Sequence, residues 1–320
     1  MTRNHIPVLV FYGPTGTGKS ALAESFFSVD SPAVYVPDWR GRAEIISADS
    51  MQVYRGMDIG TAKPDAASRR SLPHHIIDLV SPDCQFGSGD FVRLADEACA
   101  DIHARGKFPV IVGGTGFYIK NFLYGLPVTP ESDTATRIRI TERMRIQGAA
   151  ALMAELAQVD PVSASRISLN DEYRIIRALE VYENSGRPLS SFALPSCFRK
   201  EYRFLVLFLD RPRPILYERI EQRVARMFLD GLADEVRSLV DAGYTASDPG
   251  MRAIGYREFF GPADEFLTAD TGAIANAIVL DSKKYAKRQE TFIRSIPGVV
   301  RVPAEDNQGI HRLVSNFLGT

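Results

Sequence analysis

The segment Gly13–Ser20 reads Gly-Pro-Thr-Gly-Thr-Gly-Lys-Ser and contains every fixed position of the phosphate-binding P-loop motif. The apolar run Ile6–Tyr12 precedes it, and the helix-forming segment Ala21–Glu24 follows it. In such a loop the backbone N–H groups converge on a phosphate, the helix N-terminus adds positive potential, and Lys19 adds a full charge. Ser20 is then placed to ligate a magnesium ion that bridges two phosphates. The motif and its context together predict a polyphosphate site.

A carboxylate and a hydroxyl follow the second predicted strand, Ala43–Ala48, as Asp49 and Ser50. Because α/β sheets bind ligands at the carboxyl ends of their strands, we expect Asp49 to lie near the P-loop. Two other interpretations stay open at this point. Asp49 could cap a helix, or it could assist a magnesium ion as in ordinary nucleotide hydrolases.

Apolar runs alternate with helical periodicity along the first part of the chain, which predicts βα units on a mostly parallel sheet. Besides the two strands above, strands are expected over His75–Val80, Phe108–Val112, Tyr202–Leu209 and Gly298–Val302. Helices are expected over Asp90–Ala104, Pro212–Ala242 and Gly272–Ser295, and a strand-free helical stretch over Asp133–Gly186.

The expected fold class is therefore α/β, with a P-loop NTPase-like sheet flanked by helices and an all-helical insertion. Residues 1–130 and 200–320 are predicted to form the α/β core. Residues 131–199 are predicted to form the insertion and to contribute to binding of a substrate.

Composition excludes few partners. The formal net charge of −1 neither requires nor forbids nucleic acid, so a basic surface would have to be local. The three cysteines, Cys84, Cys99 and Cys197, form no C-x-x-C pair, which argues against a disulfide framework or a zinc site. Without a signal-peptide pattern or a bilayer-length apolar stretch, the expectation is a soluble cytoplasmic protein that does not enter a membrane.

Seven further segments follow the P-loop in chain order, and with it they resemble the bacterial type of the tRNA dimethylallyltransferase family. The segments are Ser47–Tyr54, Met57–Pro64, Val112–Tyr118, Asn170–Arg174, Arg177–Val181, Arg252–Arg257 and Lys287–Gln289. They span nearly the whole chain, so the resemblance does not depend on the P-loop alone.

The resemblance implies a magnesium-dependent transfer of a dimethylallyl group to the exocyclic amine of the adenosine 3′-adjacent to the anticodon in tRNA, with release of pyrophosphate. In this family the P-loop holds dimethylallyl diphosphate instead of a nucleotide. The implied partners are dimethylallyl diphosphate and the anticodon stem-loop of tRNA, and the expected state is a monomer.

The resemblance also implies roles for individual residues. Asp49 is the general base, and Thr115 contacts the target nucleotide and the reacting centre; both also belong to the tRNA site. Ser20 ligates magnesium. The residues expected to bind the diphosphate are Gly13, Thr15, Gly16, Thr17, Gly18, Lys19, Ser20, Arg219 and Arg223. The other residues expected to contact tRNA are Ser50, Met51, Gln52, Arg137, Tyr173, Arg174, Arg177, Arg252, Gly255, Tyr256, Arg257, Lys287, Arg288 and Gln289.

Not every arginine of the insertion is assigned to RNA. Arg139, Arg143 and Arg145 are interpreted as a solvated helix face.

Two other classes of protein share parts of this pattern. A small-molecule or nucleotide kinase would use the same loop with ATP, and the insertion would then resemble its arginine-rich lid. A non-catalytic P-loop RNA-binding protein would keep the basic segments but would have no use for Asp49 or Thr115.

Overall fold

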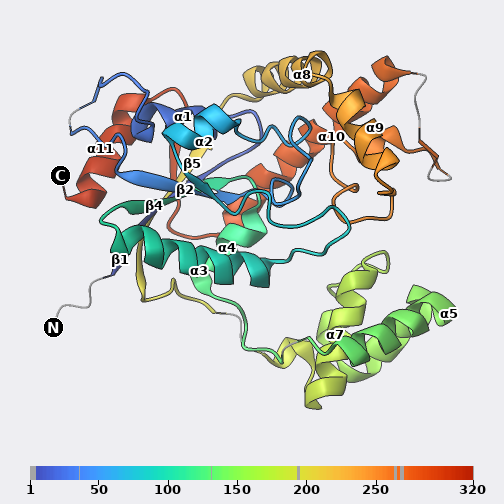
Figure 1. Cartoon of the computed structure of the whole chain (residues 1–320). Coiled ribbons are helices and arrows are strands. Elements are labelled where there is room, and N and C mark those ends of the chain that lie inside the picture. The colour runs from blue at the N-terminus through green and yellow to red at the C-terminus, as the bar shows by residue number, and fades with distance from the viewer. Residues whose placement is uncertain are drawn as a thin grey trace. The chain divides into compact units, whose positions relative to one another are not determined.

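A computed structural model describes residues 5–35, 37–130, 132–192, 195–262, 265–266 and 270–319 of the 320-residue chain. The chain forms two compact units (Figure 1). Unit 1 consists of Met1–Leu123 and Arg199–Thr320, and unit 2 consists of Tyr124–Phe198. The sequence predicted an insertion over residues 131–199, and its contribution to tRNA binding stays a prediction.

Unit 1 is built on a six-stranded sheet in which every neighbouring pair of strands is parallel. The strand order is β3-β2-β4-β1-β5-β6, so β1 lies between β4 and β5. This confirms the predicted fold class. The strands are β1 (Ile6–Tyr12), β2 (Ala43–Ala48), β3 (His74–His75), β4 (Phe108–Gly113), β5 (Tyr202–Asp210) and β6 (Val300–Pro303).

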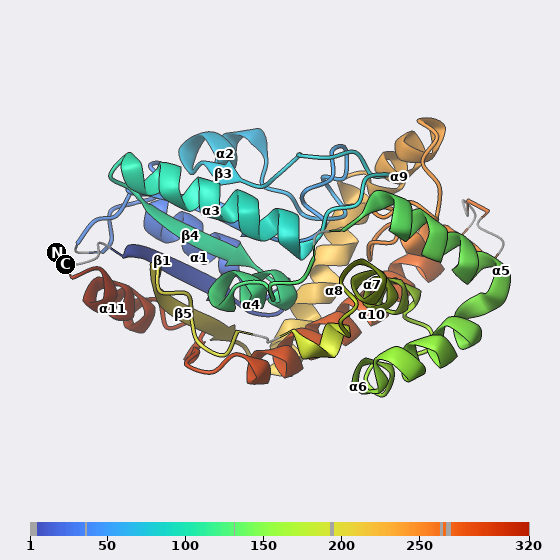
Figure 2. The same ribbon diagram turned by 90° about the horizontal axis from the view of Figure 1, so that it is seen from below.

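Helices cover both faces of this sheet, which explains why its central strands are continuous apolar runs. On one face α1 (Lys19–Phe27) and α11 (Asn307–Leu318) pack on side chains of β1, β2, β4 and β5. On the other face α3 (Ser88–Ala104) lies across the strands with α4 (Gly116–Tyr124) beside it (Figures 1 and 2).

Two long helices of unit 1 lie on the side of the sheet where the strands have their carboxyl ends (Figure 2). α8 (Arg213–Leu229) and α10 (Thr271–Phe292) pack together through Leu216, Ile220 and Ala286 (Figure 2). Gly231, with φ of 98°, separates α8 from α9. The other elements of this unit are α2 (Ala66–Ser71), α9 (Leu232–Asp241), η2 (Arg257–Phe259) and η3 (Ile293–Ser295).

The strand expected over His75–Val80 is wrong beyond its first residue, because β3 ends at His75. Ile76 and Asp78 have φ of 61° and 57°, which no β-strand contains. The backbone N–H groups after them are used by another loop, since Leu79 and Val80 donate to the carbonyl oxygen of Val53 at 2.8 and 3.1 Å. An apolar run therefore leads here into a tightly bonded loop.

Unit 2 is helical, with its core formed by α5 (Thr134–Val159) and α7 (Glu172–Ser185). α5 is interrupted at Gly148, whose φ of 80° and ψ of 164° are not helical. Asp133 and Asp171 cap the two helices, accepting hydrogen bonds from the backbone N–H groups of Thr136 and Arg174. The short elements are α6 (Pro161–Ala164) and η1 (Leu189–Ser191).

No helix in the described part of the chain combines the length and the apolar character that crossing a membrane requires.

Candidate active site

The P-loop joins β1 to α1, and its backbone depends on glycine. Gly16 and Gly18 have φ of 84° and 99°, a region that L side chains rarely adopt. A Cβ on Gly13 would lie 2.8 Å from the carbonyl oxygen of Leu209. The loop therefore turns sharply at the end of β1 and leads into α1, whose first N–H groups have no helical carbonyl partner.

Gln289 of α10 fixes the position of the P-loop. Its Oε1 accepts a hydrogen bond from the backbone N–H of Thr15 at 2.9 Å, and its Nε2 donates to the carbonyl oxygen of Gly114 at 2.7 Å. Its own carbonyl oxygen accepts from the hydroxyl of Tyr12 at 3.0 Å. The Gln289 side chain is only 4% exposed and joins the P-loop to the turn after β4. Its predicted contact with tRNA stays a prediction.

Two arginines of α8 reach the P-loop, as the family resemblance implies. Arg219 donates from Nε to the carbonyl oxygen of Gly16 at 2.7 Å, and Arg223 donates from Nη1 to Oγ1 of Thr15 at 3.2 Å. Together with Lys19 they line a pocket of about 450 Å³. This concentration of positive charge at a helix N-terminus suits a phosphorylated ligand.

Arg211 is a third arginine at the loop, and the sequence analysis did not find it. Its Nε and Nη2 lie 3.4 and 3.3 Å from the carbonyl oxygen of Thr17, to which both donate. The buried Thr17 hydroxyl donates in turn to the carbonyl oxygen of Pro14 at 2.8 Å. The Thr17 hydroxyl thus stabilises the loop from within, and the predicted binding of Thr17 to the diphosphate stays a prediction. A lone arginine after β5 carries no motif that could have revealed the contact of Arg211.

Lys19 lies at the centre of the loop, where its Nζ donates to the carbonyl oxygens of Gly13 and Pro14 at 2.9 and 2.8 Å. The pKa of Lys19 is lowered to about 7, mainly by burial and then by the charge of Arg223, while the charge of Asp49 opposes the shift. A buried ammonium held against an arginine is a destabilised charge, and an anionic ligand would relieve it.

Asp49 and Thr115 are brought together by the strand order, because β2 and β4 are neighbours and their carboxyl ends meet. The backbone N–H of Thr115 donates to the carbonyl oxygen of Ala48 at 3.1 Å, and its Oγ1 accepts from the backbone N–H of Ser50 at 3.0 Å. Oδ1 of Asp49 accepts from the backbone N–H of Met51 at 2.9 Å. Among the described residues, no hydrogen bond is made by Oδ2 of Asp49. The segment after Asp49 is a turn, so the alternative of a helix cap is wrong.

A cavity of about 260 Å³ opens beside these residues. Its polar wall includes Asp49 and Arg223, and its apolar wall includes Ile220, Val224 and Met227. A pocket lined by both charged groups and aliphatic side chains fits a ligand that has a phosphorylated head and a short apolar tail.

Tyr285 of α10 also lines this cavity and was not predicted. The pKa of Tyr285 is raised to about 12, mainly by burial and then by the charge of Asp49. Its hydroxyl donates to the carbonyl oxygen of Gly114 at 3.4 Å, and the guanidinium of Arg288 lies 5.6 Å from its ring centroid. The helical spacing from Arg288 was the available signal. Lys287 and Arg288 themselves are exposed.

Two members of the predicted tRNA segment 252–257 are exposed and two are not. Arg252 and Arg257 are exposed and line the cavity. Gly255 is buried, and Tyr256 is 0% exposed with its hydroxyl bound to Glu235. The Tyr256 side chain packs inside unit 1, and its predicted contact with tRNA stays a prediction.

The segment after Asp49 is held by side-chain hydrogen bonds of its own. Ser47 Oγ donates to Oε1 of Gln52 at 2.8 Å, and Nε2 of Gln52 lies 3.4 Å from the carbonyl oxygen of Thr61. Ser50 and Met51 line the cavity, whereas both polar atoms of Gln52 are used within unit 1.

In unit 2 the predicted tRNA residues Arg137 and Tyr173 stack, with the guanidinium 4.9 Å from the ring centroid. The side chain of Arg174 is 63% exposed and pairs only with Asp171, at 3.1 Å, among the described residues. These three side chains present an aromatic ring and two cations on the surface of the unit.

Arg177 has a more internal position in unit 2. Its side chain is 22% exposed, its Nη2 donates to the carbonyl oxygen of Pro130 at 2.7 Å, and its Nη1 lies 3.0 Å from Oε2 of the buried Glu180. Arg177 therefore holds the segment that enters unit 2, and its predicted contact with tRNA would have to be made by the small exposed part.

In the part of the chain that the structure describes, the predicted magnesium site at Ser20 has few protein oxygen ligands around it. Ser20 is exposed at the first turn of α1 and lines the same pocket as Lys19. Among the described residues no group of three His, Cys, Asp or Glu side chains could hold a metal ion. The donor set fits magnesium that is bound mainly through the oxygens of a diphosphate, with the Ser20 hydroxyl as a protein ligand.

A parallel sheet with a P-loop after its central strand, and a carboxylate after a nearby strand, defines a P-loop protein that binds a phosphorylated ligand. Residues 52–296 match the family model described as IPP transferase. The chain belongs to this family, as the sequence resemblance predicted.

The relatives carry the same activity in their names. The tRNA dimethylallyltransferase of Geobacter sulfurreducens is 41% identical over 315 residues, covering 98% of this chain and 97% of that protein. That of Geobacter metallireducens is 44% identical over 289 residues, covering 90% of this chain and 89% of that protein.

Solved structures with the same fold agree with these relatives. The tRNA isopentenylpyrophosphate transferase of Bacillus halodurans aligns with a TM-score of 0.66 at 31% identity, covering 98% of this chain and 97% of that one. A eukaryotic dimethylallyltransferase acting on tRNA aligns with a TM-score of 0.79 at 26% identity, covering 98% and 80%. The kinase and the non-catalytic alternatives are not supported by these comparisons.

Proposed function

We propose that this protein transfers the dimethylallyl group of dimethylallyl diphosphate to the exocyclic amine of the adenosine 3′-adjacent to the anticodon of tRNA, releasing pyrophosphate. The observation that carries the proposal is the cavity that Asp49, Arg223 and an apolar wall share beside the P-loop. Membership of the IPP transferase family supports the reaction class.

The leaving group requires positive charge. As the carbon–oxygen bond to the diphosphate breaks, negative charge develops on the pyrophosphate oxygens. Lys19 and Arg219, with Arg223, are the side chains of the loop region that stabilise it. Magnesium, held at Ser20 when the diphosphate is bound, supplies further positive charge to the same oxygens.

The attacking amine requires a base, because its lone pair is delocalised into the adenine ring. The carbon–nitrogen bond forms as the carbon–oxygen bond breaks, and the amine proton goes to the carboxylate of Asp49. The Oδ1 bond to the N–H of Met51 orients that carboxylate. Thr115 fixes the same turn through Ser50 and borders the reacting centre.

The RNA partner follows from the same chemistry, since a base can reach the cavity only when it leaves its stack. An anticodon loop is single-stranded, which lowers this cost, and single-stranded bases are recognised by aromatic rings and arginine planes. The proposed RNA contacts are the exposed residues Arg252, Arg257, Lys287 and Arg288 of unit 1, the exposed Tyr173 and Arg174 of unit 2, and the half-buried Arg137 that stacks on Tyr173. A cytoplasmic monomer is the state we expect for such an enzyme.

Incubation of the protein with unmodified tRNA, magnesium and either labelled dimethylallyl diphosphate or labelled ATP tests the function. We expect label from dimethylallyl diphosphate to enter the tRNA with one pyrophosphate released per product, because the apolar wall suits a five-carbon tail. ATP is expected to bind weakly and to remain intact. Release of inorganic phosphate from ATP in step with tRNA turnover would instead support a kinase-like use of the loop.

Replacing Arg174 or Arg252 with alanine is expected to weaken tRNA binding by about 10-fold and to reduce the salt dependence of binding by roughly one counterion. The affinity for dimethylallyl diphosphate should stay within about 2-fold, since neither side chain contacts the P-loop. Arg145→Ala is the matched control, because Arg145 is exposed in unit 2 and pairs with Glu142 at the same helical spacing as Arg174 with Asp171. Equal losses for both substrates, or a loss in the control, would contradict the assignment.

A further inference from the structure

Glu235, in the first turn of α9, accepts four hydrogen bonds on one carboxylate. Oε2 accepts from the backbone N–H groups of Asp58 and Ile59 at 2.9 and 2.7 Å. Oε1 accepts from the backbone N–H of Gly60 at 3.2 Å and from the hydroxyl of Tyr256 at 2.6 Å. One side chain therefore joins the turn 58–60 to the loop 250–257.

The turn and the loop also touch directly at this point. A Cβ on Gly60 would lie 2.5 Å from the ring of Tyr256, so only glycine fits there. Gly255 has φ of 100°, and a Cβ on it would lie 3.5 Å from the carbonyl oxygen of Gly60. Burial and the charge of Glu235 raise the pKa of Tyr256, so its hydroxyl keeps the proton that it donates.

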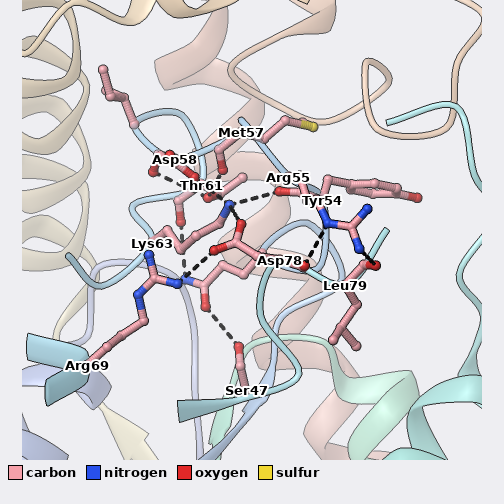
Figure 3. Close-up of polar contacts among 12 residues, drawn as sticks. Ser47, Tyr54, Arg55, Met57, Asp58, Thr61, Lys63, Arg69, Asp78 and Leu79 are labelled. Atoms are coloured by element: carbon pink, nitrogen blue, oxygen red, sulfur yellow. Dashed lines mark hydrogen bonds and ion pairs between the residues drawn. The ribbon is translucent and has the colours of Figure 1, made fainter. Parts of the chain in front are cut away.

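The turn is held from its other side by the buried ammonium of Lys63, whose side chain is 1% exposed (Figure 3). Lys63 donates to the carbonyl oxygen of Tyr54 at 2.8 Å and to Oδ1 of Asp58 and of Asp78 at 2.5 and 2.6 Å. Arg69 binds the second oxygen of Asp78 at 2.7 Å. The turn 58–60 is therefore held by Lys63 on one side and by Glu235 on the other.

Both segments reach the cavity. Gly60 and Thr61 line it from the turn, and Arg252 and Arg257 line it from the loop, whereas Glu235 does not line it. The carbonyl oxygen of Thr61 is 3.4 Å from Nη2 of Arg223, which also binds the P-loop. Glu235 thus supports two walls of the cavity from outside. One wall is the turn 58–60 with Thr61, beside Arg223, and the other is the loop 250–257, which carries the proposed RNA contacts Arg252 and Arg257.

We propose that Glu235 is a positioning residue for prenyl transfer, which sets the distance between the diphosphate side and the RNA side of the cavity by holding both walls on one carboxylate. This inference rests on the proposed function. It assigns Glu235 no contact with either substrate, so its effect belongs to the step in which both substrates are bound and must align.

Glutamine cannot replace this carboxylate. Each oxygen of Glu235 accepts two donors, and glutamine offers one accepting oxygen and one N–H₂ group. Whichever way the amide turns, its N–H₂ group faces at least one backbone N–H of the turn 58–60, so the turn loses one or two of its three bonds to this side chain. A misplacement of about 1 Å between reacting groups costs about 100-fold in rate.

The test compares Glu235→Gln with Asp234→Asn in the full-length protein. Both changes remove one negative charge from the first turn of α9, but only Glu235 binds the turn and the loop. In Glu235→Gln we expect the single-turnover rate at saturating dimethylallyl diphosphate and tRNA to fall by about 10- to 100-fold, with both dissociation constants within about 3-fold of wild type. Asp234→Asn should keep the wild-type rate.

Tyr256→Phe is the milder variant, because it removes one of the four bonds and keeps the packing of the ring. We expect its single-turnover rate to fall by roughly 3- to 10-fold, with the unfolding midpoint lowered only by the loss of this one hydrogen bond. Wild-type rates in Tyr256→Phe and in any folded Glu235→Gln, or an equal loss in Asp234→Asn, would overturn the proposal. An inactive wild-type protein would instead overturn the proposed function, so the two failures are distinguishable.

Discussion

Lys19→Ala is expected to lower kcat/KM for dimethylallyl diphosphate by about 100- to 1,000-fold, the usual effect of removing one preorganised donor from a developing anion. The Lys19 ammonium lies at the centre of the loop on two carbonyl oxygens and within the fields of Arg223 and Asp49. Its charge serves the ligand, because burial of an ammonium without an anion is unfavourable for the fold. The steady-state kinetics of the variant give the measurement.

The lowered pKa of Lys19 predicts a pH dependence. Between about pH 7 and the ordinary lysine pKa of 10.5, the folded protein holds this side chain neutral while the unfolded chain holds it protonated. The unfolded state therefore binds more protons in this window, and the contribution of Lys19 to the free energy of unfolding rises with pH. Denaturant unfolding at pH 7 and pH 9 should show this increase in wild type and not in Lys19→Ala.

The affinity for a diphosphate ligand is expected to change with pH in the opposite direction to the free energy of unfolding. A diphosphate favours the ammonium form, so binding above pH 7 takes up a proton and the affinity falls as pH rises. We expect the decline between pH 7 and pH 9 to be steeper in wild type than in Lys19→Ala. Lys200→Ala, at an exposed lysine before β5, is the control and should behave as wild type. Equal turnover in Lys19→Ala and wild type would refute the P-loop assignment.

The parts of the fold that sequence predicted well are those that local pattern determines. β1 and β2 begin and end where their apolar runs do, at Ile6–Tyr12 and Ala43–Ala48, because both are buried on two faces and end at turn residues. The P-loop was also predictable from local sequence, because its glycines and Lys19 lie within one short segment.

The parts that it missed depend on contacts between distant segments. The family resemblance marks the runs Arg252–Arg257 and Lys287–Gln289, which contain Tyr256 and Gln289, but it does not say which side chains of these runs point inward. Gln289 is buried because its amide matches two groups, on Thr15 and Gly114, that lie far from it in sequence. Glu235 shows no motif at all, since its four donors come from two other segments.

Asp49→Asn is expected to reduce the chemical step by about 100- to 10,000-fold, roughly 3 to 5.5 kcal/mol of transition-state stabilisation, while both substrates still bind. Asparagine keeps the size of the side chain and an oxygen that can accept from the backbone N–H of Met51, so the turn at the end of β2 is preserved. It lacks the negative charge and cannot take a proton at neutral pH. Single-turnover rates should therefore collapse while the dissociation constant for tRNA stays near that of wild type.

The control for this prediction is Asp65→Asn, because Asp65 is a true helix cap that accepts from the backbone N–H of Ser68 at 2.7 Å. Asparagine caps about as well as aspartate, so this variant should turn over normally and report what the substitution does to structure alone. If Asp49 acted mainly through magnesium, raising the magnesium concentration would restore much of the rate lost in Asp49→Asn. Such a rescue, or near-normal turnover at ordinary magnesium, would remove Asp49 from the role of base. A rescue by magnesium would leave the assignment of prenyl transfer intact, but the proton acceptor would then have to be another group that borders the cavity. Tyr285 borders it but cannot serve, because its raised pKa keeps its hydroxyl protonated at neutral pH.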